Sequence, residues 1–219
     1  MLITQNNDLH VIKIQSYLNN LDNFSNSSGA IFLDRDGVLI EDKHYLSSPS
    51  LVELEKGVEN LINISNSLEL KLFVITNQSG VGRGYFSWED YQDVTNMMLK
   101  LLPSTNSICA IYASGESPEK SSRFRKPSPY MIKLACSEYN IDPKKSIFIG
   151  DRISDLQAAA RSEIQIAIHT LTGKGKAERN LILESTKKGF FVDSFSNSKI
   201  KIKFINCLEE LCLDNFLIQ

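Results

Sequence analysis

The fold of this chain is decided by residues 31–38, which read Ile-Phe-Leu-Asp-Arg-Asp-Gly-Val. The apolar run ends in two aspartates, Asp34 and Asp36, and Gly37 follows them. A short apolar run bounded in this way predicts a buried strand whose carboxyl end opens into a loop. In open α/β sheets, ligands bind at that end. Asp and Gly also favour plain turns, so a turn and an active site both fit these residues taken alone.

The composition is that of a globular chain, with 42% hydrophobic residues among 219. The net charge of −2 gives no electrostatic sign of nucleic-acid binding, so we expect no nucleic-acid partner. No apolar run approaches membrane-spanning length, and residues 1–10 lack the basic start and apolar core of a secretory signal. We therefore expect a cytoplasmic protein with no membrane partner.

The four cysteines form no recognisable metal or disulfide pattern; they are Cys109, Cys136, Cys207 and Cys212. None stands in a C-x-x-C pair, and no histidine lies close enough in the chain to complete a cluster. We therefore expect neither a disulfide framework nor a structural zinc site.

The chain divides into an N-terminal extension and one domain. Residues 9–21 suggest a short, irregular amphipathic element, and residues 23–29 are a polar linker, so residues 1–28 form the extension and residues 29–219 the domain. Strands are predicted over 30–34, 71–76, 108–113, 146–150, 164–169 and 200–205. Helices are predicted over 57–68, 88–101, 129–139, 154–162 and 206–213. Continuous apolar strands that alternate with helices predict an α/β fold with a doubly wound, mostly parallel sheet.

Polar groups follow four of these strands at the point where each strand ends. They are Asp34 and Asp36 after the first, Thr76 and Asn77 after the second, Arg125 and Lys126 in the loop after the third, and Asp151, Arg152 and Asp155 after the fourth. Because the carboxyl ends of parallel strands share one edge of a sheet, we expect these groups to converge there.

The chemistry that such a group supports is phosphoryl transfer. Mg²⁺ takes oxygen ligands, which Asp34 and Asp151 would supply. With its charge partly offset, Asp34 attacks phosphorus and forms an aspartyl phosphate, while Asp36 protonates the leaving oxygen and then activates water. Thr76 offers a hydroxyl and Asn77 an amide to the phosphoryl oxygens. Lys126, just before a predicted helix start at Ser128-Pro129, offers an ammonium to the same group.

Each piece also has an ordinary structural explanation. Thr76-Asn77 alone is more often a turn, and Arg125 and Lys126 would usually be solvated surface charges. An aspartate such as Asp151 is a common helix N-cap. Four strand ends in succession, each with a suitable group, are hard to obtain from packing needs alone, which favours an active site.

These segments together resemble the haloacid dehalogenase superfamily of phosphohydrolases. The matching blocks are residues 34–37, Thr76-Asn77, Lys126 and residues 150–155, in the order typical of that superfamily, and the resemblance spans residues 30–175. Within it, residues 32–37, 76–84, 125–129 and 171–175 resemble the branch of D-glycero-D-manno-heptose 1,7-bisphosphate 7-phosphatases and histidinol-phosphatases. That resemblance implies a Rossmann-like fold with no large cap domain.

The resemblance also implies a role for each site residue. Asp34 would be the nucleophile and Asp36 the general acid and base, and Mg²⁺ would be held by Asp34, the backbone carbonyl of Asp36 and Asp151, with Arg152 adjacent and Asp155 in support. The phosphate would be held by Thr76, Asn77, Gln78, Ser79 and Lys126. Substrate would be contacted by Arg125 and by Asp42, Lys43, His44 and Tyr45.

Two departures from the family pattern stand out. Val38 replaces a commoner threonine. Many relatives also carry a Cys/His zinc cluster in the loop that corresponds to residues 113–124. Here the ligand positions are Ser114, Glu116, Ser122 and Phe124, which supply no thiolate site. Because that loop borders the substrate in relatives, its change bears on substrate identity rather than on the catalytic core.

The expected function is that of a monomeric, Mg²⁺-dependent phosphohydrolase acting on a small phosphorylated sugar. The favoured substrate is heptose 1,7-bisphosphate, a precursor for lipopolysaccharide or other surface glycans, and histidinol phosphate is the nearest alternative. A polynucleotide 3′-phosphatase shares the motifs, but the net negative charge counts against it. A catalytically silent binding module on the same fold is the alternative of another class.

Overall fold

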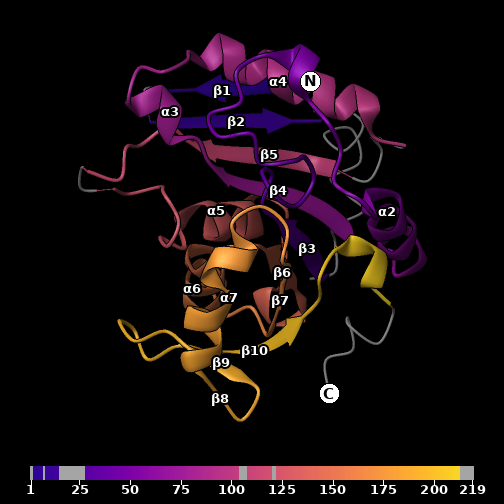
Figure 1. Ribbon diagram of the computed structural model, residues 1–219, viewed down its shortest axis with the longest axis vertical. Helices are drawn as coiled ribbons and strands as arrows, with labels where there is room; N and C mark the ends of the chain where they lie inside the picture. Colours follow the sequence, from indigo (N-terminus) through magenta and orange to yellow (C-terminus); the bar gives the residue numbers. More distant parts are fainter. Residues whose placement is uncertain (1, 7, 15–27, 104–107, 120–121, 213–219) are drawn as a thin grey trace.

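A computed structural model describes residues 2–6, 8–14, 28–103, 108–119 and 122–212. Its described strands form one ten-stranded sheet in the order β1-β2-β5-β4-β3-β6-β7-β10-β9-β8, which runs from top to bottom in Figure 1. The six central strands are parallel; they are β5 (Ile108–Ser114), β4 (Lys71–Asn77), β3 (Ala30–Leu33), β6 (Ile147–Gly150), β7 (Ile166–His169) and β10 (Lys199–Phe204). The predicted α/β fold with a mostly parallel sheet is confirmed.

Antiparallel strands extend this sheet at both sides. On one side, β1 (Leu2–Gln5) pairs with β2 (Leu9–Lys13), which pairs with β5. On the other, β9 (Phe190–Val192) pairs with β10 and with β8 (Thr186–Lys187). The amphipathic element expected over residues 9–21 is thus a strand where it begins, and residues 15–27 lie outside the described residues. The division of the chain at residue 28 stays a prediction.

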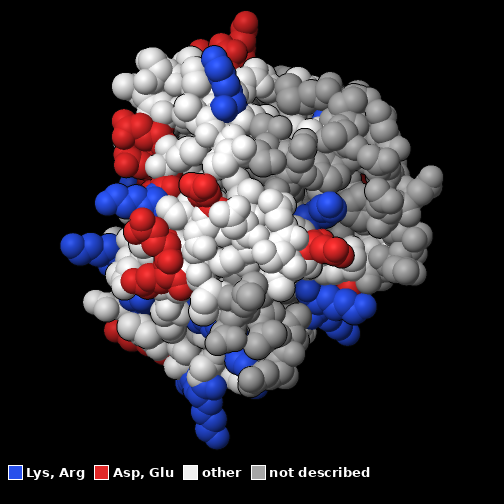
Figure 2. Space-filling view, turned by 90° about the vertical axis from the view of Figure 1, so that its right-hand side faces the viewer, with Lys and Arg blue, Asp and Glu red and all other residues white. Residues whose placement is uncertain are grey.

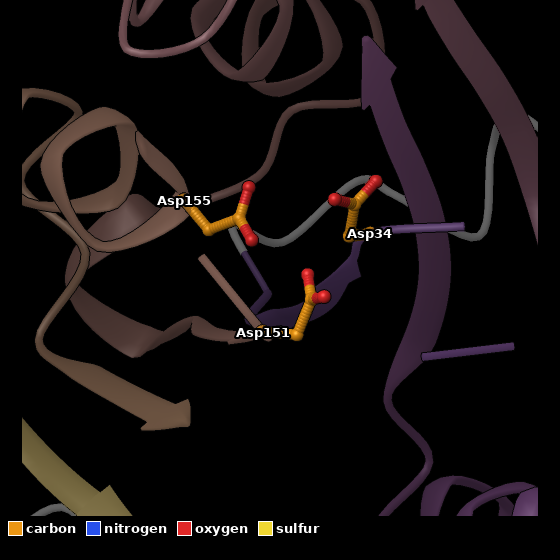
Figure 3. Close-up of side chains that lie close together, drawn as sticks. All are labelled: Asp34, Asp151 and Asp155. Carbon is orange, nitrogen blue, oxygen red and sulfur yellow. The ribbon is translucent and has the colours of Figure 1, made fainter. Parts of the chain in front are cut away.

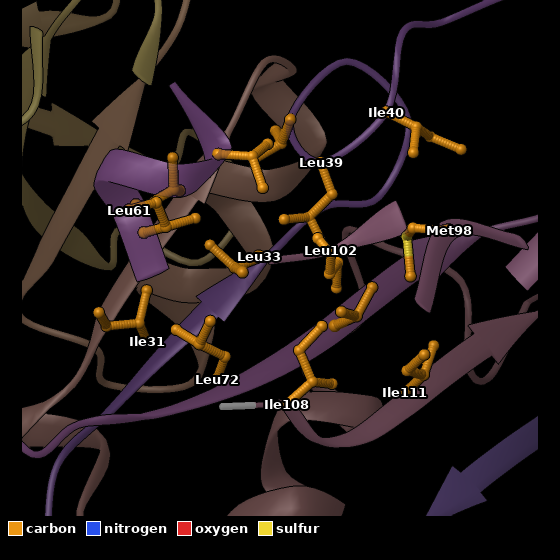
Figure 4. Packing of buried hydrophobic residues seen from close by; sticks show 14 of the residues in the cluster. Ile31, Leu33, Leu39, Ile40, Leu61, Leu72, Met98, Leu102, Ile108 and Ile111 are labelled. Carbon is orange, nitrogen blue, oxygen red and sulfur yellow. The ribbon is translucent and has the colours of Figure 1, made fainter. Parts of the chain in front are cut away.

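Helices cover both faces of the sheet. On one face lie α2 (Val58–Ser67) and α4 (Trp88–Leu101), and on the other α5 (Tyr130–Glu138), α6 (Ile153–Arg161) and α7 (Gly175–Glu184). Strand side chains alternate between the two, since Ile31 and Leu33 join the first core and Phe32 joins the second. Figure 4 shows the first core, where Leu61 of α2 and Met98 of α4 lie near the strand residues.

Most helix predictions are confirmed to within one or two residues. At α4 the N-cap residue Ser87 forms a capping box with Asp90, whose N–H donates to Ser87 Oγ at 3.1 Å. The helix predicted over 206–213 is wrong in its described part, which holds a single 3₁₀ turn, η5 (Leu208–Glu210). Asn60 Nδ2 donates to the carbonyls of Leu208 and Leu211 at 2.9 and 3.0 Å, so a side chain satisfies groups that a helix would use internally.

Three broader features complete the description. No separate cap domain is evident in the described ranges, in line with the expectation from the motifs. Among the same residues, none of the helices combines the length and apolarity needed to span a bilayer. Figure 2 shows one face of the molecule, on which acidic and basic side chains are intermixed. The expected cytoplasmic location and lack of a nucleic-acid partner stay predictions.

Candidate active site

A cavity of about 440 Å³ opens at the carboxyl ends of the central strands. Its lining includes residues that follow all four strands singled out in the sequence, among them Asp34, Asn77, Arg125 and Asp151. The parallel order β5-β4-β3-β6 brings these strand ends side by side. The predicted convergence of polar groups at one sheet edge is therefore present in the structure.

Asp34 lies directly after β3 at the floor of this cavity. Its side chain is buried, and the backbone N–H of Arg35 donates to Asp34 Oδ1 at 2.7 Å. Oδ2 lies 2.9 Å from Lys126 Nζ. Burial raises the pKa of Asp34 to about 7, although Lys126 lowers it. A further positive charge beside this carboxyl would favour its ionised form.

Three carboxyl groups meet at this point, from Asp34, Asp151 and Asp155, and Figure 3 shows them pointing toward one another. One oxygen from each lies within 4.8 Å of the others, and all three residues are buried. Burial and the neighbouring charges of Asp155 and Asp34 raise the pKa of Asp151 well above its usual range.

Within this group of three carboxyls, Asp151 Oδ1 is an oxygen that accepts no hydrogen bond from the described residues. Its partner atom Oδ2 accepts from Lys174 N at 2.6 Å, whereas the buried Oδ1 has no hydrogen-bond partner among the described residues. A buried, unpartnered carboxylate oxygen beside two other carboxylates is a donor set that suits a hard cation such as Mg²⁺.

Lys126 neutralises part of the negative charge. Its buried ammonium lies 2.9 Å from Asp34 Oδ2 and 2.7 Å from Asp155 Oδ1, and it donates to the carbonyl of Ile75 at 2.7 Å. Burial alone lowers the pKa of Lys126, but Asp155 and Asp34 outweigh it and raise the pKa above its usual value. Asp155 Oδ2 also accepts from Arg152 N at 3.0 Å, which fixes Asp155 at the start of α6.

Asp36 is held by a buried arginine and a buried amide. Arg35, only 1% exposed, donates from Nε and Nη2 to the two oxygens of Asp36 at 3.2 and 3.0 Å. Gln78 Nε2 donates to Asp36 Oδ2 at 2.8 Å and to Thr76 Oγ1 at 2.9 Å. The Arg35 guanidinium also lies over the ring of Tyr91, with Arg35 Cζ 5.0 Å from the centroid of that ring. Neither the Arg35 contacts nor those of Gln78 follow from spacing in the sequence.

Asn77 and Ser79, both predicted to hold the phosphate, have different surroundings in the structure. The side chain of Asn77 contacts the backbone of Lys126, as Oδ1 accepts from Lys126 N and Nδ2 donates to Lys126 O. Ser79 lines the cavity at the start of the short helix α3 (Ser79–Gly82). The predicted phosphate contacts of Thr76, Asn77, Gln78 and Ser79 stay predictions, and the structure adds internal bonds for the first three.

Three of the four residues predicted to contact substrate after the first strand line the cavity. Asp42 Oδ2 lies 3.1 Å from Lys174 Nζ, and Asp42 Oδ1 accepts from His44 N at 3.1 Å. His44 and Tyr45 both have left-handed backbones, with φ of 43° and 59°. Such backbone angles are costly for non-glycine residues and concentrate at functional sites.

Lys43 is the exception in this segment. It is not among the cavity-lining residues, and its ammonium pairs with Glu53 and lies 3.7 Å from Glu41 Oε2. These pairs account for its charge without a substrate. The predicted substrate contact of Lys43 stays a prediction that the cavity lining does not support.

Besides Arg35, three arginines line the cavity; they are Arg83, Arg125 and Arg152. Burial lowers the pKa of Arg125, and the positive charges of Arg152 and Arg83 lower it further. Arg125 Nη1 is buried with no hydrogen-bond partner among the described residues. Arg152 Nε donates to Glu178 Oε1 at 3.1 Å, and Arg83 pairs with Glu119. No site role was assigned to Arg83 from the sequence, although it lies within the motif of residues 76–84.

Known proteins resemble this chain in sequence and in fold. The HAD-hydrolase-like family model matches residues 123–197. The D-glycero-beta-D-manno-heptose-1,7-bisphosphate 7-phosphatase of Helicobacter pylori is 36% identical over 142 residues, 64% of this chain and 82% of that protein. The D-glycero-alpha-D-manno-heptose-1,7-bisphosphate 7-phosphatase of Campylobacter jejuni is 34% identical over 176 residues, 80% of this chain and 94% of that protein.

Two solved structures share the fold. The D,D-heptose 1,7-bisphosphate phosphatase of B. bronchiseptica, complexed with magnesium and phosphate, has a TM-score of 0.67 and 24% identity over 82% of this chain and 93% of its own. That of Burkholderia thailandensis has a TM-score of 0.57 and 24% identity over 83% of this chain and 94% of its own. The chain belongs to the haloacid dehalogenase superfamily of phosphohydrolases, in its branch of heptose 1,7-bisphosphate phosphatases, and is a phosphoric monoester hydrolase.

Proposed function

We propose that this enzyme removes one phosphate from D-glycero-D-manno-heptose 1,7-bisphosphate through an aspartyl phosphate on Asp34. The observation that carries the proposal is the position of Asp34, which contacts Lys126 at 2.9 Å and shares the cavity floor with Asp151. This arrangement supplies a nucleophile, the Asp34 carboxylate, and a positive charge, the Lys126 ammonium, where a phosphoryl group would enter from the cavity.

The reaction proceeds in two displacements. An oxygen of Asp34 forms a bond to phosphorus as the bond to the sugar oxygen breaks, and Asp36 gives its proton to that oxygen. Water then attacks the phosphorus of the aspartyl phosphate, Asp36 takes a proton from the water, and inorganic phosphate leaves. Asp34 is restored as a carboxylate and Asp36 as the acid. Lys126 holds its charge beside Asp34 throughout.

Mg²⁺ is the metal that we assign to this site. Asp34, Asp151 and the backbone carbonyl of Asp36 would hold it, and Asp151 Oδ1 is the buried oxygen that otherwise lacks a partner. When bound, the ion offsets the negative charge of the phosphoryl oxygens and of the carboxylates around them. The solved relative from B. bronchiseptica was crystallised with magnesium and phosphate, which supports the choice of metal.

The choice of a sugar bisphosphate rests on the relatives and on the charge of the cavity. The curated relatives from H. pylori and C. jejuni are named as heptose bisphosphatases. Arg83, Arg125 and Arg152 line a cavity of about 440 Å³, a size suited to a small ligand. The unpartnered Nη1 of Arg125 is suited to a second anionic group on that ligand. The two relatives are named for opposite anomers, so both anomers of this substrate need testing.

A phosphate-release panel tests this proposal. The purified enzyme is assayed with Mg²⁺ on each anomer of heptose 1,7-bisphosphate, on histidinol phosphate and on a 3′-phosphorylated oligonucleotide. We expect the highest kcat/KM on one heptose anomer, release of the 7-phosphate alone, and no release by Asp34→Asn. Preference for histidinol phosphate or the oligonucleotide would overturn the substrate assignment, and turnover by folded Asp34→Asn would overturn the nucleophile. We further propose a monomeric, cytoplasmic enzyme that binds no nucleic acid, and sedimentation of the purified protein tests the monomer.

A further inference from the structure

The loop between β5 and α5 is organised by one carboxylate, that of Glu116. Three consecutive backbone N–H groups donate to it. Arg123 N donates to Oε1 at 2.7 Å, and Phe124 N and Arg125 N donate to Oε2 at 2.6 and 2.8 Å. Hydrogen bonds to a charged acceptor are among the stronger ones in proteins, and three in a row fix the course of the backbone.

Two hydroxyl groups complete the set. Ser122 Oγ donates to Glu116 Oε2 at 2.8 Å, and Ser114 Oγ donates to the same oxygen at 3.2 Å. Burial raises the pKa of the half-buried Glu116, but the donated hydrogen bonds outweigh it and hold the pKa below its usual value. The carboxylate is thus ionised at neutral pH and is the common acceptor for both arms of the loop, residues 114–116 and 122–125.

The family resemblance implies zinc ligands at four positions of this loop, where this chain has Ser114, Glu116, Ser122 and Phe124. None offers a thiolate or an imidazole, and the carboxylate already accepts five hydrogen bonds. These residues do not fit a structural zinc ion. They bond instead to one another through Glu116.

The loop is also fixed against its surroundings. Gly115 N donates to Asp8 O at 2.9 Å, next to β2. On the other side, a Cβ added at Gly82 would lie 2.3 Å from the carbonyl oxygen of Gly115, so the two segments approach closely only because residue 82 is a glycine. The arm of residues 122–125 ends at Arg125, whose side chain lines the cavity, and Lys126 follows it directly. The position of the Arg125 guanidinium therefore depends on the position of this backbone.

We propose that Glu116 is a positioning residue that orders this loop without a metal and thereby holds Arg125 where it meets the second phosphate of the substrate. The part of this inference that concerns substrate rests on the proposed function. The part that concerns the loop does not.

Hydrogen exchange followed by mass spectrometry tests the loop. The variant is Glu116→Gln, which keeps the shape of the side chain and removes its charge. The matched control is Glu59→Gln, which makes the same change at an exposed position on α2. We expect the amides of residues 122–125 to exchange about tenfold faster in Glu116→Gln, equivalent to about 1.4 kcal/mol, and at the wild-type rate in the control. Unchanged exchange in Glu116→Gln would overturn the inference, as would one tightly bound zinc per wild-type chain.

Kinetics on two substrates test the effect on Arg125. For heptose 1,7-bisphosphate we expect KM to rise about tenfold in Glu116→Gln with little change in kcat, and Glu116→Asp to restore part of the loss. For p-nitrophenyl phosphate, which has no second phosphate, both constants should stay at the wild-type values. Faster exchange with an unchanged KM would overturn the link to Arg125. If the wild-type enzyme released no phosphate from heptose 1,7-bisphosphate, the proposed function would be refuted, but the conclusion drawn from hydrogen exchange would still hold.

Discussion

The side-chain amide of Asn77 forms hydrogen bonds with both the backbone N–H and the backbone carbonyl of Lys126. Lys126 N donates to Asn77 Oδ1 at 2.9 Å, and Asn77 Nδ2 donates to Lys126 O at 3.1 Å. This pair of bonds joins the end of β4 to the loop before α5, residues that lie 49 positions apart. The ammonium of Lys126 lies 2.9 Å from Asp34 Oδ2, so the contact between the Asn77 amide and this backbone helps to decide where the Lys126 charge lies.

Replacing this amide should therefore reduce catalysis without touching the nucleophile. In Asn77→Ala we expect kcat to fall by about 10-fold or more, because supporting residues of this kind typically contribute 10- to 100-fold. The free energy of unfolding should fall by about 1–3 kcal/mol from the lost hydrogen bonds. Steady-state kinetics and urea unfolding measure the two effects, with Asn63→Ala on the exposed side of α2 as the control. Wild-type kcat in Asn77→Ala would show that Lys126 holds its place unaided.

Arg35 should act on Asp36 and not on substrate binding. The Arg35 guanidinium donates from Nε and Nη2 to both carboxylate oxygens of Asp36. Gln78 Oε1 also accepts from Arg35 Nη2, at 3.1 Å. Arg35→Lys keeps the charge but loses the fork, so Asp36 loses its fixed orientation. We expect kcat to fall by about 100-fold with KM within about twofold, since proton transfer by a positioned side chain contributes about 10²–10⁴-fold. A rise in KM at constant kcat would show instead that Arg35 contributes to binding.

Most strands of the central sheet were predictable from the sequence because they are buried on both faces. Runs such as residues 72–75 and 147–149 are continuously apolar, which distinguishes them from the amphipathic helices between them. The segment Leu9–Lys13 was not predictable in this way. Its residues contribute to both cores, and a short, partly apolar segment of that length fits a strand and a helix equally well. Similarly, α7 was missed because Ile182 is the only apolar side chain that it buries among its described residues.

The site was predictable to the extent that it depends on strand ends. Asp34, Lys126 and Asp151 each follow a recognisable strand or loop, and the parallel order brings them together. The backbone contacts of Asn77 and Glu116 were not predictable, because both side chains bond to main-chain groups whose course is set by the tertiary fold. Lys43 is an opposite example, because the family resemblance implied a substrate contact for it and yet it is not among the residues that line the cavity.

Mg²⁺ should stabilise the folded enzyme. Three carboxyl groups with oxygens within 4.8 Å repel one another when ionised, and a cation among them relieves that repulsion. At 100 times its Kd, a ligand of the native state adds about 2.7 kcal/mol, which for a chain of this size raises Tm by about 5–10 °C. Thermal unfolding in Mg²⁺ and in EDTA measures the shift.

A pair of variants makes this test specific to the site. Asp151→Asn removes one of the three charges, so we expect a higher Tm in EDTA and almost no gain from Mg²⁺. Asp93→Asn makes the same change at an exposed position of α4 and should keep the full gain. An equal Mg²⁺ effect in both variants would place the ion elsewhere.

Stability should also fall in mild acid because His10 is buried and forms no ion pair within the part of the chain that the structure describes. Its ring lies 5.0 Å from that of Trp88 and 5.4 Å from that of Tyr91, and burial lowers its pKa below 6.5, outweighing the hydrogen bond with Gln92 that raises it. Between the lowered pKa and 6.5, the unfolded chain binds more protons than the folded one, so the free energy of unfolding falls as pH drops through this window. Burial and Arg179 lower the pKa of His169 to about 4, and this residue adds to the same trend.

Replacing His10 with a ring that cannot titrate isolates its share. His10→Phe fills the same space between the two aromatic rings, so we expect a smaller difference in unfolding free energy between about pH 5 and about pH 7.5 than in the wild type. His169 accounts for part of the dependence that remains. Urea unfolding at the two pH values measures the difference. Equal pH dependence in the two proteins would mean that His10 takes up its proton in the folded state as readily as in the unfolded chain, and that β2 moves away from α4 to admit the charge.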